Sequence, residues 1–111
     1  MSPIELAKAL NLKIINPGNG SERAVNGVFC CDLLSIVMGK AKADVAWITV
    51  MCNINTIAVA VLSDVSCVII SEGYTADNDM IKKAEEQGVC LLQSDLPTFE
   101  LALAIHSLLP S

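Results

Sequence analysis

The most constraining feature of this sequence is the stretch from Asp44 to Gly73, which is almost free of charged residues. It opens with a nearly continuous apolar run, residues 45–51, and closes with a second run, residues 65–70. Between the two runs, apolar residues recur at the three- and four-residue spacing of one helix face: Ile54, Ile57, Ala58, Val61 and Leu62. Continuous apolar strands joined by an amphipathic helix are typical of a parallel sheet that is covered on both faces.

The rest of the chain extends this unit into an α/β fold, which we expect to be a three-layer α/β/α arrangement around a mostly parallel central sheet. The 111 residues suit a single domain, residues 1–111. The other elements that we predict are a helix from Pro3 to near Asn11, strands at 12–15 and 24–31, a helix at 33–40, a helix ending at Gln87, a strand at 89–93, and a last helix running to about Leu109.

Several residues mark the expected helix ends. Ser2 and Glu5 have the spacing of a capping box, and Gly88 is placed to end a helix in the left-handed conformation. Asp77 or Thr75 can cap the helix that Gly88 ends. We expect Asp32 to cap the helix after it, and Ser94 or Asp95 to cap the last helix, with Pro97 in its first turn.

Composition argues against nucleic acid and membrane partners. The formal net charge is −5, and the seven basic residues are scattered among acidic ones, whereas phosphate binding needs clustered Lys and Arg. Residues 45–63 carry no charge and are long enough to span a bilayer, but Asn53 and Asn55 interrupt them and the apolar period changes there. We therefore expect no membrane span.

The expected compartment is the cytoplasm. The first residues lack the basic region and apolar run of a secretory signal, and five cysteines, an odd number, fit a reducing environment. Cys67 and Cys90 lie inside apolar strand runs, where we expect inert core thiols.

The last predicted helix is apolar nearly all round, which indicates burial on more than one side. Since the domain is small, we expect a homodimer through this helix, with Leu103 and Ile105 in the interface. The alternative is that the helix only covers the sheet of a monomer. Its apolar residues are Phe99, Leu101, Ala102, Leu103, Ala104, Ile105, Leu108 and Leu109.

A binding site is expected where the strands end. In an open parallel sheet, ligands bind beyond the carboxyl ends of the strands, where the following helices begin and their free N–H groups favour anions. This places a small-molecule or nucleotide site among Asp32, Asn53, Asn55, Ser71, Glu72, Gly73 and Asp95. The competing interpretation is that these residues are only helix caps and a turn.

Two other classes of function have weaker support in the residues. Cys30, Cys31 and Cys52 could begin a zinc or iron–sulfur site at the same edge, although adjacent cysteines point apart and no Cys-x-x-Cys spacing occurs. A small enzyme would need a nucleophile beside a base, but the sole histidine, His106, is far along the last helix. We therefore predict no catalytic residues, no resident metal and no cofactor.

Short segments distributed over the chain resemble the DRTGG domain family, in an order and spacing that cover it from about Glu5 to Leu109. They are Cys31-Asp32-Leu33-Leu34-Ser35, Val37-Met38-Gly39-x-Ala41, Trp47-Ile48-Thr49-Val50, Asn55-x-x-Ala58-Val59-Ala60, Val68-Ile69-Ile70, Ala84-Glu85-x-x-Gly88 and Thr98-Phe99-Glu100. The resemblance implies the fold of the N-terminal domains of MurF and of HPr kinase/phosphorylase. It also implies a small stand-alone member of a family found in phosphotransacetylases and CBS-containing pyrophosphatases, with a link to iron hydrogenase and other redox operons.

One departure from the family pattern bears on function. The pattern places Thr-Gly-Gly after the third apolar strand, where this chain has Ser71-Glu72-Gly73. An acidic side chain at this turn argues against anion binding there, and no kinase phosphate loop is attached. What the resemblance implies is a non-catalytic regulatory domain that senses a ligand or binds a protein partner.

Overall fold

Five strands form one sheet in the computed structural model, which describes residues 1–110. In sheet order they are β1 (Lys13–Asn16), β5 (Leu91–Gln93), β4 (Cys67–Ile70), β3 (Val45–Thr49) and β2 (Gly27–Cys30). The strands β2 to β5 are parallel, whereas β1 pairs antiparallel with β5 at one edge. The predicted mostly parallel sheet is therefore confirmed.

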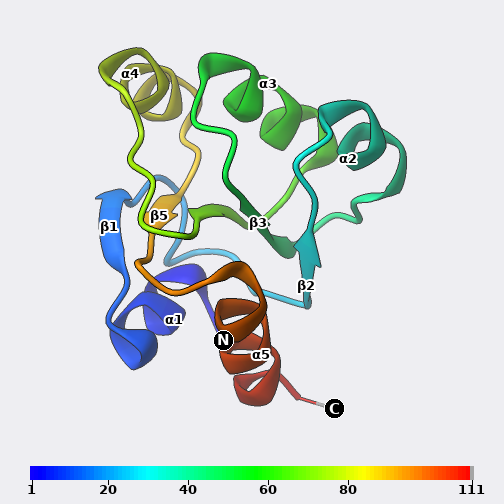
Figure 1. Ribbon diagram of the computed structural model, residues 1–111, viewed down its shortest axis with the longest axis vertical. Helices are drawn as coiled ribbons and strands as arrows, with labels where there is room; N and C mark the ends of the chain where they lie inside the picture. Colours follow the sequence, from blue (N-terminus) through cyan, green and yellow to red (C-terminus); the bar gives the residue numbers. More distant parts are fainter. Residues whose placement is uncertain (111) are drawn as a thin grey trace.

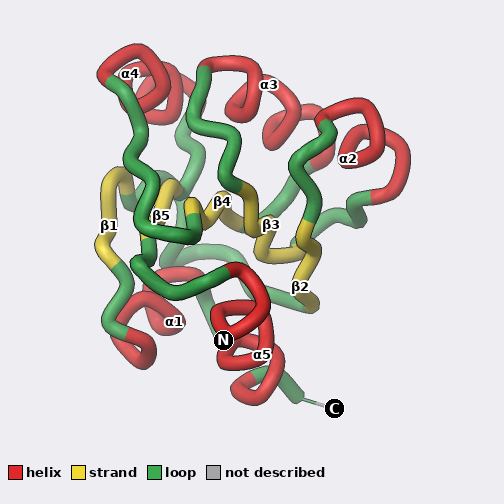
Figure 2. Tube along the Cα trace, viewed as in Figure 1, coloured by secondary structure: helices red, strands yellow, loops and turns green. Residues whose placement is uncertain are grey.

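Helices cover both faces of this sheet, which gives the expected three layers (Figures 1 and 2). On one face lie α2 (Leu34–Lys40), α3 (Ile54–Ser63) and α4 (Asn78–Gln87), and on the other lie α1 (Pro3–Leu10) and α5 (Thr98–Leu108). Among these helices of the described chain, none is both long enough and apolar enough to cross a membrane.

The two central strands supply the core on both sides of the sheet. Every residue of β3 and of β4 is buried. Because successive side chains of a strand alternate between faces, Ala46 and Ile48 pack towards α1 and α5, while Trp47 packs towards α2, α3 and α4. The Trp47 indole N–H donates a hydrogen bond to the Cys31 carbonyl at 2.9 Å, which satisfies its one polar atom inside the core.

Most helix ends follow their expected signals. Ser2 and Glu5 form a complete capping box, Asp77 caps α4, and Gly88 ends α4 with φ of 69°. Two expected caps are wrong. The residue before α2 is Leu33, which makes no side-chain cap, because the Asp32 carboxylate bonds elsewhere.

The start of α5 is the second correction. Pro97 is its cap position rather than part of its first turn, and Asp95 makes no cap. The Ser94 hydroxyl instead accepts a hydrogen bond from the Leu96 N–H at 3.0 Å, which closes a turn before the helix. The Thr98 N–H, at the first residue of α5, donates instead to the Glu72 carboxylate.

Only one side of α5 reaches the core of the described chain. Leu101 and Ile105 are fully buried beside the sheet, so Ile105 is a core residue and its expected place in a subunit interface is wrong. Phe99 and Leu103 are 71% and 53% exposed. One side of this apolar helix therefore covers the sheet, and the other side faces outwards.

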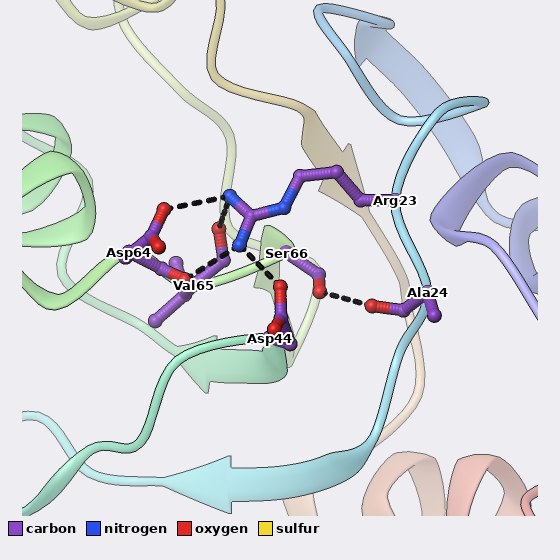
Figure 3. Close-up of polar contacts among 6 residues, drawn as sticks. All are labelled: Arg23, Ala24, Asp44, Asp64, Val65 and Ser66. Carbon is purple, nitrogen blue, oxygen red and sulfur yellow. Dashed lines mark hydrogen bonds and ion pairs between the residues drawn. The ribbon is translucent and has the colours of Figure 1, made fainter.

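A partly buried guanidinium ties three segments together at the amino ends of the strands (Figure 3). Arg23 donates to the Asp64 carboxylate and the Val65 carbonyl, both at 3.0 Å, and to the Asp44 carboxylate and the Asp64 carbonyl. Burial opposes the charge of Arg23, but the hydrogen bond to Asp44 and the charges of both carboxylates outweigh it and raise the pKa of the guanidinium. The crossover before β2 is thereby fixed to the starts of β3 and β4.

We expect Arg23→Ala to lower the free energy of unfolding by about 2–3 kcal/mol, since it removes several charge-assisted hydrogen bonds and leaves the Val65 carbonyl without its donor. The fold should persist, because the neighbouring bond from Ser66 to the Ala24 carbonyl remains. Urea unfolding measures the change. Lys82→Ala, at an exposed residue, is the control and should change stability by less than about 0.5 kcal/mol. Equal stability of the two variants would contradict the role of Arg23.

Candidate functional site

Thr49, the last residue of β3, connects the carboxyl ends of three neighbouring strands. Its hydroxyl donates to the Asp32 carboxylate after β2 at 2.8 Å, and the Val50 N–H donates to the same oxygen at 2.9 Å. Its carbonyl accepts from the Ser71 N–H after β4 at 3.2 Å. Thr49 is 1% exposed, so these bonds replace water for a buried hydroxyl.

The turn after β4 continues this chain of polar contacts to α5. The Ser71 and Thr98 hydroxyls lie 2.6 Å apart, and the Thr98 N–H donates to the Glu72 carboxylate at 2.7 Å. In return, the Glu72 N–H donates to the Leu96 carbonyl at 2.9 Å, and the Gly73 N–H donates to the Ser94 carbonyl at 3.0 Å. The first turn of α5 is therefore capped by a side chain that lies 26 residues earlier in the sequence.

Glu72 supplies a negative charge where a helix would otherwise attract an anion. The N-terminus of an α-helix carries unpaired N–H groups and a partial positive charge. An external anion at the start of α5 would have to displace this carboxylate. Glu72 holds a φ of 62°, a conformation that favours glycine, so the contact is made at some cost in backbone strain.

The predicted site residues fall into three groups at this edge. Ser71, Glu72 and Gly73 come together, and Asp95 joins them, since a side-chain carbon on Gly73 would lie 3.6 Å from the Asp95 carboxylate. Asp32 is joined to Ser71 through Thr49.

Asn53 and Asn55 form the third group, at the start of α3. The Asn53 side chain accepts a hydrogen bond from the Asn55 N–H at 2.9 Å and caps the helix. This is the role that the helix-cap alternative to a binding site predicts for Asn53. The neighbouring Thr56 hydroxyl donates to the Met51 carbonyl at 2.7 Å and holds the loop against the helix.

A cavity of about 110 Å³ opens beside Asp95, just after the end of β5. Asp95 and Ser94 line it together with Lys13 and Gln93 from the neighbouring strands and with Asn11. Its lining thus combines a carboxylate, an ammonium, two amides and a hydroxyl. Such a surface can bind a polar group of a small ligand through several hydrogen bonds.

Sequence reasoning missed Thr49 and Thr98 as parts of this edge. Both carry a hydroxyl at the junction between an apolar segment and a loop. Each hydroxyl forms a hydrogen bond with a side chain that is distant in the sequence. The isolated threonine at the end of an otherwise apolar strand was the available signal, but it identifies no partner by itself.

The three cysteines of the metal alternative do not form a cluster. Cys30 is exposed, whereas Cys31 and Cys52 pack towards the core under α2, α3 and α4. Partial burial, and then the charge of Asp32, raise the pKa of the Cys30 thiol, while burial and Asp77 raise the pKa of Cys52. Within residues 1–110, no three side chains of His, Cys, Asp or Glu are arranged to hold a metal ion.

Cys67 and Cys90 are buried core residues, as expected. Burial raises the pKa of the Cys90 thiol to about 12, and that of Cys67 is also raised well above its usual value by burial. Both thiols therefore stay protonated and unreactive near neutral pH.

Two substitutions at Glu72 separate the effect of its helix cap on stability from the effect of its backbone strain. We expect Glu72→Ala to cost about 1 kcal/mol, because α5 loses its cap while the left-handed backbone remains strained. Glu72→Gly loses the same cap but relieves a strain of roughly 1 kcal/mol, so its stability should lie close to that of the parent. Chemical unfolding measures both variants, and an alanine variant as stable as the glycine variant would disprove the strain.

The sequence matches the family model of the DRTGG domain over residues 5–108. A similar solved structure contains the CBS and DRTGG domains of the regulatory region of Clostridium perfringens pyrophosphatase, in complex with the activator diadenosine tetraphosphate. The TM-score is 0.72 at 14% sequence identity, over 98% of this chain and 47% of that one. This chain thus spans about half the length of the chain in that structure, and the likeness shows a shared fold. None of the curated proteins compared is similar in sequence.

Proposed function

Because the chain belongs to the DRTGG domain family, we propose that it is a regulatory domain, one that binds a small ligand such as a nucleotide and acts as a homodimer. The observation that carries this proposal is the edge where β2, β3, β4 and β5 end, in a fold shared with a regulatory region that was solved with a nucleotide activator. Open parallel sheets bind their ligands at this edge.

The charges at the edge suggest which part of a nucleotide would bind there. Asp32, Glu72 and Asp95 are all exposed carboxylates, which repel phosphate but accept hydrogen bonds from ribose hydroxyls and base amino groups. Asn53 and Asn55 add amide groups that both donate and accept. We therefore expect the nucleoside part of the ligand to contact this edge, with Lys13 in the cavity beside Asp95 as a positive charge within reach of its phosphates.

The same contacts support a regulatory rather than a catalytic role. The Thr49 hydroxyl lies beside the Asp32 carboxylate, as a nucleophile lies beside a base, but it is buried and holds β2 and β3 together. The Ser71 hydroxyl is engaged with Thr98. His106 is exposed near the end of α5, away from the start of the helix where the strand ends gather.

Thermal unfolding with diadenosine tetraphosphate, ATP, AMP and adenosine tests the proposed binding. A ligand at ~100 times its Kd contributes ~2.7 kcal/mol, which raises Tm by several degrees in a domain of this size. We expect a saturable shift that is lost in Asp95→Ala and Asn53→Ala. Glu86→Ala, at an exposed residue near the end of α4, should keep it. A shift of equal size in all variants, or none with any compound, would contradict the proposed site.

The outward side of α5 is the proposed dimer contact. Phe99 and Leu103 expose large apolar side chains on a helix whose Leu101 and Ile105 are buried against the sheet. We expect Leu103→Glu to convert the dimer to a monomer in analytical ultracentrifugation, because a charge would be buried in the interface. Leu62→Glu makes the same change at a leucine of α3 that is 74% exposed, and should leave the dimer intact. An unchanged mass for the Leu103 variant would refute this contact.

A further inference from the structure

The two edges of the sheet are protected to different degrees. β1 carries the charged Lys13, and its pairing with β5 shifts between Ile14 and Asn16. Charges and irregular pairing are features by which natural edge strands avoid joining other chains. β2 has neither a charged residue nor a proline, and it pairs with β3 in regular register from Gly27 to Cys30.

The unprotected edge is also the one beside the exposed apolar helix. α5 packs against β2 and β3, so it lies under the end of the sheet that β2 forms (Figure 1). Within the described chain, no strand lies beyond β2 in the sheet. The unpaired edge of β2 and the helix that exposes Phe99 and Leu103 therefore lie at the same end of the sheet.

We propose that two copies of this chain pair through antiparallel β2 strands about a two-fold axis, so that one sheet continues across the dimer. This proposal rests on the homodimer proposed above and specifies its geometry. An antiparallel pair of identical strands is self-complementary, because each copy offers the other the same row of N–H and C=O groups. The same axis brings the two α5 helices to one face of the joined sheet.

Charge complementarity favours a second copy over an unrelated strand. Asp32 follows β2 at its carboxyl end, whereas Lys40 is the last residue of α2 and Lys42 lies in the connection that leads to the amino end of β3. Antiparallel pairing places the carboxyl end of one β2 beside the amino end of the other. Asp32 of each copy then faces the end of its partner that carries Lys40 and Lys42. Among the described residues, neither lysine has an ion pair within its own chain.

Hydrogen exchange of the full chain tests this pairing, measured at concentrations above and below dimer dissociation. We expect exchange of residues 27–30 to slow at least tenfold in the dimer, whereas residues 13–16 of the opposite edge exchange at the same rate in both states. The double variant Lys40→Glu/Lys42→Glu should weaken the dimer about tenfold, since several exposed ion pairs are reversed. Lys82→Glu/Lys83→Glu makes the same charge change on α4, which packs near β1, and should leave the dimer unchanged.

The outcomes separate this inference from the proposed homodimer. A dimer whose α5 is protected while residues 27–30 exchange freely would overturn β2 pairing and leave the α5 contact standing. A monomer at every concentration would overturn both. Equal effects of the two double variants would overturn the antiparallel orientation.

Discussion

Burial of β3 and β4 on both faces is the constraint on which the rest of this structure depends. Their nine residues are buried without exception, so the backbone groups can be satisfied only by neighbouring strands and the side chains only by helices on each side. Polar chemistry is thereby excluded from the middle of the sheet. It gathers where the strands end, with Arg23 and its carboxylates at the amino ends and the Asp32, Thr49, Ser71 and Glu72 contacts at the carboxyl ends.

Sequence patterns predicted the layers of this fold because the signals are local. The uninterrupted apolar run of β3 and the helical spacing in α3 each report burial within a few residues. The antiparallel edge strand was not specified, since its place depends on distant contacts. One example is the bond from the Asn16 amide to the Val89 carbonyl, across 73 residues.

The sequence predicted which residues follow the strand ends, but not the bonds that their side chains make. Asp32 and Glu72 were recognised as strand-end residues, yet their partners, Thr49 and Thr98, lie 17 and 26 residues away, and a cap signal names only the nearest helix. Ile105 shows the same limit, because a helix that is apolar all round does not reveal which side meets the sheet. These contacts join four strands to α5. In a regulatory domain, a ligand that binds at this edge would therefore change the bonds between the strands and α5, and with them the surface that the domain offers to a partner.

Backbone NMR titration with diadenosine tetraphosphate tests the account most directly, with adenosine and inorganic phosphate titrated separately. If the edge binds the nucleoside part of a ligand, amide shifts will be confined to residues 50–55, 71–74 and 94–98 and will be reproduced by adenosine but not by phosphate. Shifts that gather around Arg23 at the amino ends of the strands, or that phosphate alone reproduces, would contradict it.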